Sequence, residues 1–72
     1  MKNREINELD VIALLKEIPV HGLVRGDIGT VVTILSDSVY EVEFMAEHGV
    51  SKAVIPVTEK DIMKIHFERL PV

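Results

Sequence analysis

TVVTILSDSVYEVEF, residues 30–44, is the part of the sequence that decides the fold. Two runs rich in Val, Ile and Thr flank residues 36–38, Ser-Asp-Ser, whose side chains favour turns by hydrogen bonding to nearby backbone. The stretch therefore predicts a β-hairpin. Residues 39–44 alternate strictly, so that one face is apolar and the other acidic. The apolar face consists of Tyr40, Val42 and Phe44, and the acidic face of Glu41 and Glu43. We expect the apolar face to lie in the core.

A second turn and a third strand follow this hairpin. Glu47-His48-Gly49 supplies the turn, because Gly49 can adopt a positive φ, and residues 50–57 continue as a strand. Three consecutive antiparallel strands form a meander. Pro56 cannot donate a hydrogen bond to a sheet, so we expect the third strand to end there or to lie at a sheet edge. That edge is a candidate interface.

The segments on either side of the meander each fit two structures. Residues 6–17 can be fitted to a helix, which composition favours slightly, while residues 10–18 are apolar enough for a buried strand. Residues 58–61 have the spacing of a capping box and predict one helical or 3₁₀ turn. Residues 62–67 alternate as a strand does, with Met63, Ile65 and Phe67 on one face. Because Met63, Phe67 and Leu70 also match helical spacing, the strand is the preferred of two interpretations.

The stretch VHGLVRGDIGTVV, residues 20–32, leads into the hairpin. Gly26 and Gly29 permit backbone angles that are barred to other residues, and the Asp27 side chain can accept hydrogen bonds from nearby amides. We therefore interpret the stretch as a bend that delivers the chain into its second strand, with Ile28 pointing into the core. Its Arg-Gly-Asp tripeptide is better explained by this bend than by integrin recognition, because the polar N-terminus has no secretion signal.

Length and charge limit the classes of function. A chain of 72 residues forms one domain, residues 1–72, and buries only a small core. It has no cysteine to staple the fold, which makes a homodimer a reasonable source of further burial. The net charge of −4 disfavours nucleic acid, and no apolar segment is long enough for a signal peptide or a membrane span. We expect a cytoplasmic protein.

The sequence does not predict catalysis, a metal site or a cofactor. His21, His48 and His66 lack the spacing that places two imidazoles on one helical face. Glu41 and Glu43 share a strand face as a glycosidase pair could, but alternating glutamates beside an apolar face are usually a solvated exterior. The serines lie in turn contexts, and the glycines do not have phosphate-loop spacing. We expect a protein that is not an enzyme.

DVIALLKEIP, HGLVRGDIGTVV and YEVEF together resemble a widespread prokaryotic family of small domains of unknown function with an SH3-like barrel fold. The resemblance spans about residues 8–57. It implies a mainly β fold, a small barrel of about five antiparallel strands with one short 3₁₀ or helical turn. It also implies that Asp10–Glu17 is the first strand and that Pro19–Gly29 is a long loop like the RT loop of such barrels. The family brings no established activity.

These observations favour a binding function over a catalytic one. The leading hypothesis is a non-catalytic interaction module that binds a protein partner or itself through residues 19–29 and a sheet edge. The candidate binding residues are His21, Leu23, Arg25, Asp27 and Met45. One alternative is an acidic antitoxin or immunity-type partner of an adjacent-gene protein. Another is a nucleic-acid-binding barrel, because residues 26–31 resemble the Gly-Asp-x-Gly-x-Val pattern of KOW-type domains; Arg25, Lys52 and Lys64 would then contact phosphates.

Overall fold

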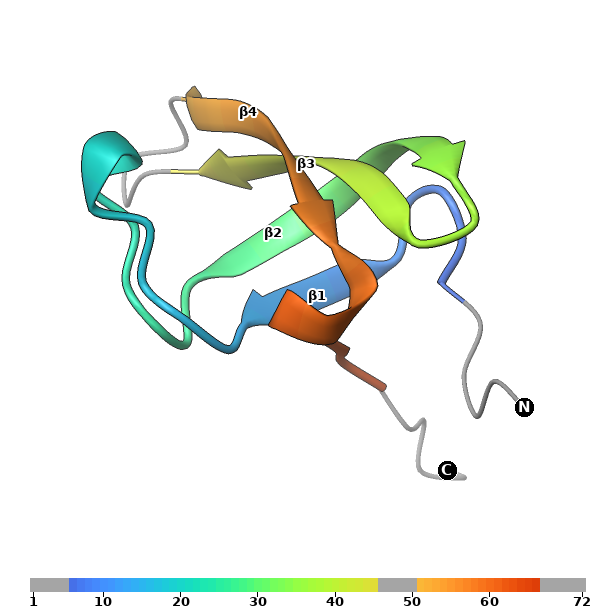
Figure 1. The fold of residues 1–72 in the computed structure, drawn as a ribbon, viewed down its shortest axis with the longest axis horizontal. Coiled ribbons are helices and arrows are strands. Elements are labelled where there is room, and N and C mark those ends of the chain that lie inside the picture. Colours follow the sequence, from blue (N-terminus) through green and yellow to red (C-terminus); the bar gives the residue numbers. More distant parts are fainter. Residues whose placement is uncertain (1–5, 46–50, 67–72) are drawn as a thin grey trace, which may run out of the picture.

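The computed structural model describes residues 6–45 and 51–66 and shows a mainly β protein (Figure 1). Its strands are β1 (Val11–Leu14), β2 (Ile28–Ser36), β3 (Val39–Met45), β4 (Ser51–Thr58) and β5 (Ile62–Lys64). Two 3₁₀ helices complete the described elements: η1 (Pro19–His21) and η2 (Glu59–Asp61). The predicted fold of about five antiparallel strands is confirmed, with one 3₁₀ turn more than expected. Within the described ranges no helix is long and apolar enough to cross a membrane.

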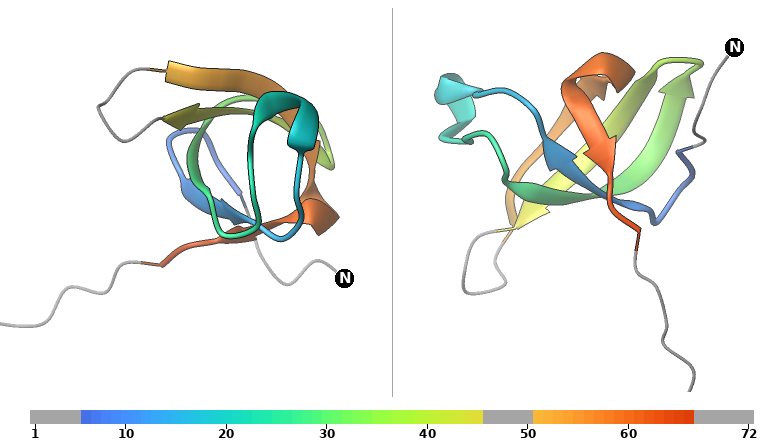
Figure 2. Two further views of the ribbon diagram at one scale, coloured as in Figure 1. Left: turned by 90° about the vertical axis from the view of Figure 1, so that its left-hand side faces the viewer. Right: turned by 90° about the horizontal axis from the view of Figure 1, so that it is seen from below.

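The strands form one antiparallel sheet in the order β4-β3-β2-β1-β5. Strands β2, β3 and β4 make the predicted meander, and β5 returns to pair with β1. The sheet is curled, as the views from the side and from below show (Figure 2), and its concave face encloses the core. Strand β4 is an edge strand and contains Pro56, in agreement with the prediction for that residue.

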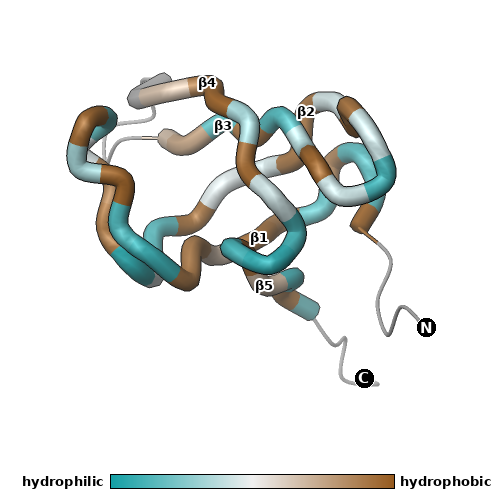
Figure 3. The backbone as a smooth tube through the Cα atoms, in the orientation of Figure 1, coloured by the Kyte–Doolittle hydropathy of each residue, from teal (hydrophilic) through white to brown (hydrophobic). Residues whose placement is uncertain are grey.

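The central hairpin follows the predicted alternation. Tyr40, Val42 and Phe44 are buried, whereas Glu41 and Glu43 are half-buried on the opposite face. The Tyr40 hydroxyl donates a long hydrogen bond of 3.5 Å to the carbonyl of Asp37 in the predicted turn. The predicted turn at residues 47–49 lies outside the described residues. Brown, apolar segments therefore alternate with polar ones along the hairpin (Figure 3).

The first element is a strand, so the helical interpretation of residues 6–17 is wrong. Strand β1 lies between β2 and β5 and pairs with both, which satisfies its backbone on two sides. Ile12 and Leu14 point into the core, and this tertiary pairing outweighs a slight helical preference. The strand is shorter than the Asp10–Glu17 that the resemblance implied, because the chain bends away after Leu14 toward η1.

The C-terminal elements confirm the predicted 3₁₀ turn and the preferred strand. At η2 the Thr58 hydroxyl donates a hydrogen bond of 2.8 Å to Asp61 Oδ2. In a capping box the hydroxyl would instead accept a hydrogen bond from a backbone N–H, and η2 has no such side-chain cap. In β5, Ile62 is fully buried and Met63 is exposed. Phe67 and Leu70 lie outside the described residues.

The bend at residues 20–32 is confirmed, but the predicted placement of Ile28 is wrong. Gly26 has φ +95°, and the Asp27 carboxylate accepts the N–H of Val24 at 3.0 Å. Ile28 is 51% exposed because its pairing with Ala13 puts it on the outer face, which leaves Gly29 and Val31 toward the core. Gly29 is required by a close approach to β3, since a Cβ there would lie 2.6 Å from Val42 Cγ1.

Candidate binding groove

An open groove of about 670 Å³ separates the segment that follows β1 from the edge strand β4 and η2. We call this feature the groove. Residues 16–21 form one side, and Val39 with residues 55–58 and 61 forms the other. Figure 1 shows η1 at one end of the molecule, below and beside β4. The groove therefore lies between the start of the predicted recognition loop and the predicted sheet edge.

A small closed loop presents the first wall of the groove. Ile18 and Leu23 exchange backbone hydrogen bonds of 2.9 and 3.1 Å, which close residues 18–23 around η1. Gly22 ends η1 with φ 68°, a left-handed conformation that glycine adopts readily. Leu23 is buried and anchors the loop in the core, while Val20 is 84% exposed at the other end of the loop. The loop thus holds an apolar side chain in water beside the groove.

Strand β4 forms the second wall. Ile55 and Val57 are buried among the core residues and form the floor, and Pro56 between them is exposed. A proline in an edge strand turns its missing N–H away from the neighbouring strand. This edge accordingly has one donor fewer for an added strand, which is a common protection against edge-to-edge pairing.

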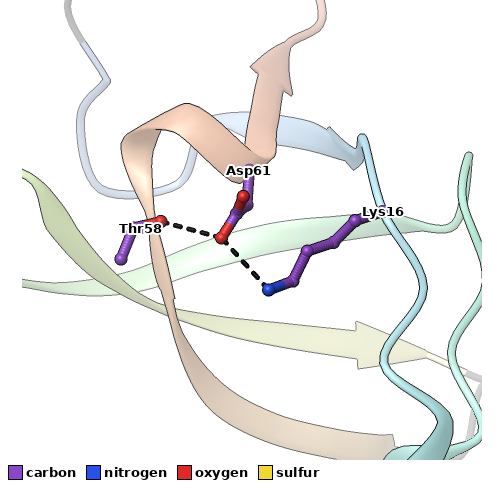
Figure 4. Close-up of polar contacts among 3 residues, drawn as sticks. All are labelled: Lys16, Thr58 and Asp61. Carbon is purple, nitrogen blue, oxygen red and sulfur yellow. Dashed lines mark hydrogen bonds and ion pairs between the residues drawn. The ribbon is translucent and has the colours of Figure 1, made fainter.

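Asp61 contacts two other polar residues of the groove lining, Lys16 and Thr58 (Figure 4). Asp61 Oδ2 accepts the hydrogen bond from Thr58 and lies 3.4 Å from Lys16 Nζ. The Thr58 hydrogen bond, followed by the Lys16 ammonium, lowers the pKa of Asp61 in spite of partial burial. The backbone carbonyl of Asp61 also accepts the N–H of Leu15 at 2.9 Å. Asp61 therefore ties the two walls together and keeps a charged pair beside the apolar floor.

A second carboxylate, Asp10, is held in a similar way at the start of β1. Its Oδ2 accepts the N–H of Asn7 at 2.8 Å and lies 3.1 Å from Lys64 Nζ. The Asn7 hydrogen bond, with a smaller contribution from Lys64, lowers the pKa of Asp10. The pair joins the entrance of β1 to β5.

The lowered pKa values of Asp10 and Asp61 predict a loss of stability in acid. A group whose pKa is lower in the folded state stabilises the fold at pH values above its unfolded pKa, here near 3.8. We expect this contribution to be complete above about pH 5 and to disappear as the pH falls through the folded pKa values. Urea unfolding followed by circular dichroism at a series of pH values measures it.

The double variant Asp10→Asn, Asp61→Asn is the test of that assignment. It should be less stable than the wild type at neutral pH and should lose less of its stability on acidification. Glu17→Gln removes an exposed negative charge and serves as control; it should keep the acid dependence of the wild type. An unchanged acid dependence in the double variant would contradict the assignment.

The predicted binding residues do not form one site. His21 is exposed and lines the groove. Leu23 is 1% exposed, so its prediction as a contact residue is wrong: it faces the core from the closed loop. Arg25 is exposed and Asp27 holds the bend, and neither lines the groove. Met45 is exposed at the end of β3, away from the groove lining.

Val20 lies in the predicted recognition loop and Pro56 in the predicted edge strand, but neither is among the candidate binding residues, and the pair Lys16–Asp61 is not predicted from the sequence. Pro56 was identified as an edge residue, and Asp61 as part of a capping signal, so each carried a local signal. Their proximity arises from tertiary structure alone. Among residues 6–45 and 51–66 no three His, Cys, Asp or Glu side chains are grouped as metal ligands. His48 lies outside these ranges.

Fold and groove together define a small antiparallel β domain with an open, largely apolar groove. Residues 8–64, from just before β1 to the end of β5, match the model of the family described as Domain of unknown function (DUF4926). The chain belongs to this family. Searches of curated proteins and of solved structures gave no significant match.

Proposed function

We propose that the protein is a non-catalytic interaction module whose groove binds an apolar segment of a partner protein. The observation that carries this proposal is the arrangement of Val20, 84% exposed on its closed loop, across the groove from Ile55 and Pro56. A valine that is almost fully exposed adds little buried apolar surface, and therefore little stability, to the isolated chain. Contact with a partner side chain would remove it from water, and such burial contributes about 25 cal/mol per Å².

The shape and the walls of the groove support a protein partner. Pockets for small molecules usually enclose most of the ligand surface. This groove is open to solvent and lies between a loop and an edge strand, as suits a segment of polypeptide. Because Pro56 weakens β4 as a template for strand addition, the partner would be held by side chains in the groove.

The proposed module is an SH3-like barrel that acts in the cytoplasm. The return of β5 to β1 and the 3₁₀ turn before β5 support the barrel that the sequence resemblance implies. An acidic partner of an adjacent-gene protein could use the same groove, since the net charge of −4 would steer a basic protein toward it. A nucleic-acid ligand has less support: Lys64 is paired with Asp10, and Arg25 is exposed but does not line the groove.

Replacing Val20 with aspartate should abolish most of the binding. Peptides selected from a random-sequence display library against the wild-type protein serve as the probe. The substitution puts a charge where an apolar contact is expected, and we expect affinity for these peptides to fall about tenfold or more, which corresponds to about 1.4 kcal/mol. Isothermal titration calorimetry measures the change.

Val24→Asp is the matched control for that experiment. Val24 is also an exposed valine in the same connection, 53% exposed, and it does not line the groove. Its substitution should leave peptide affinity within about twofold of the wild type, on the scale at which tenfold is 1.4 kcal/mol. Equal losses in both variants, or the recovery of no binding peptide, would contradict the proposed function.

A further inference from the structure

A second apolar surface lies on the outside of the sheet, away from the groove. Ile12 and Leu14 point into the core, so alternation turns Val11 and Ala13 outward. Ala13 is paired with Ile28 on one side and with Met63 on the other. We define the outer face by these residues and their neighbours: Val11, Ala13, Ile28, Met45, Met63 and Ile65.

Register makes the outer face continuous across four strands. Phe44 is paired with Gly29 and points inward, so the next residue, Met45, lies outward beside Ile28. Ile65 donates its N–H to the carbonyl of Val11 at 2.8 Å, which places it next to Val11 beyond the end of β5. Figure 2 shows β2, β1 and β5 side by side in the view from below. The result is an apolar row that runs from β3 to β5.

The large side chains of this row remain in water. Ile28 is 51% exposed, Met45 48% and Met63 46%. Ala13 is buried by its larger neighbours and yet does not belong to the core cluster, as expected for a small residue on the outside of the sheet. The outer face exposes on the order of 350 Å² of apolar surface, within the range of about 300–600 Å² at which the largest patch of a monomer is often functional.

The distribution of charge distinguishes this face from the rest of the sheet. The outward residues of β1 and β2 in this region are Val11, Ala13, Ile28 and Thr30, and none carries a charge. Glu41 and Glu43 point to the same outer side from β3, where Glu43 is paired with Thr30, so they form an acidic flank of the face. For a chain with a net charge of −4, the uncharged part on β1 and β2 is the centre on which two copies can meet, with this flank at the rim.

Area and edge geometry favour a second copy packed on this face. A stable interface buries about 800 Å² per partner, with an apolar centre and a polar rim. The outer face supplies nearly half of that area as an apolar centre. Association through sheet edges is less suited, since β5 has three residues and β4 contains Pro56. Methionine side chains at both ends of the row can adapt to the opposing surface.

We propose that two copies of this chain associate through the outer face, packed against each other about a two-fold axis. This dimer leaves both grooves open, so it is separate from partner binding. The free energy of association comes from removing Ile28 and the two methionines from water. Association is concentration-dependent, and dimer and monomer exchange at equilibrium.

Sedimentation velocity of the full chain over a wide concentration range tests the dimer. The wild type should change from monomer to dimer as its concentration rises. The double variant Ile28→Thr, Met63→Gln keeps residues that suit exposed strand positions and should raise the dissociation constant about tenfold or more, a change of about 1.4 kcal/mol. Val20→Thr, a substitution of the same kind in the groove, should leave the dissociation constant unchanged. A wild type that stays monomeric at every concentration overturns the proposal.

NMR spectra of the wild type at several concentrations locate the contact without any variant. Amide shifts that depend on concentration should cluster in β1, β5, the first half of β2 and the end of β3. Shifts confined to β4 and η1 would overturn the proposal, because they would put the contact at the groove. A dimer that Val20→Thr weakens as much as the double variant would do the same. Circular dichroism verifies that each variant is folded before its association is compared.

Discussion

Gly29→Ala is expected to destabilise the protein by about 3 kcal/mol, at the upper end of the range for overpacking a core. The added Cβ would lie 2.6 Å from Val42 Cγ1 and 2.8 and 2.9 Å from two carbons of the Phe44 ring. Both neighbours are fully buried, so neither side chain can move into water to make room. Strands β2 and β3 would have to move apart at Gly29 to make room for the added methyl group. Urea unfolding followed by circular dichroism measures the loss.

Two further variants separate overpacking from the general effect of removing a glycine. Gly26 has φ +95° and open space around it, so Gly26→Ala should cost only about 1 kcal/mol, through backbone strain. Adding Val42→Ala to Gly29→Ala removes the nearest clashing atom. The double variant should therefore be more stable than the sum of the single effects predicts. Strict additivity would contradict a steric origin.

Leu23→Ala is expected to cost about 3 kcal/mol, within the range measured for truncating buried leucines. The side chain is 1% exposed and belongs to the core cluster. Its backbone also exchanges two hydrogen bonds with Ile18, so loss of the anchor loosens the closed loop that carries Val20. We expect a large fall in the urea midpoint, accompanied by weaker peptide binding through loosening of the loop.

The next residue along the chain gives the control. Val24 is 53% exposed, and Val24→Ala should change stability by no more than about 0.5 kcal/mol, as for most surface substitutions. The comparison decides whether residue 23 belongs to the core or to the recognition surface. A stable Leu23→Ala variant that only lost affinity would support the sequence-based assignment and contradict the structure.

The hairpin could be predicted from sequence because its signal is local. Alternation in residues 39–44 identifies the buried face directly, and the Ser-Asp-Ser turn fixes where the two strands meet. Pro56 likewise indicates an edge strand through its own chemistry. The fold class, the meander and the 3₁₀ turn at residues 59–61 all follow from signals of this kind.

Local sequence signals do not predict the exposure of Ile28, the burial of Leu23 or the strand structure of residues 11–14, because each depends on long-range contacts. A shift of one residue in a strand reverses its faces, and the glycine at position 29 gave no side chain from which to read the register. Leu23 lies in a polar, glycine-rich connection and is buried only because the loop closes on Ile18. Strand β1 is stabilised by pairing with β5, from the other end of the fold. The groove depends on the same long-range contacts. The sequence can therefore indicate single groove residues, but it does not show that they lie together in the folded protein.

The pairing of β5 with β1 has a consequence for the order in which the protein folds. The meander needs only neighbouring segments, and it can form while the rest of the chain is being synthesised. The flank of β1 stays open until Ile62 leaves the ribosome, because its partner β5 is the last of the described strands in chain order. Joining segments so far apart carries a larger loop-closure entropy cost than the local pairing of the meander. A nascent chain stalled before Ile62 would therefore expose an unpaired strand edge, the feature that chaperones and aggregation both recognise.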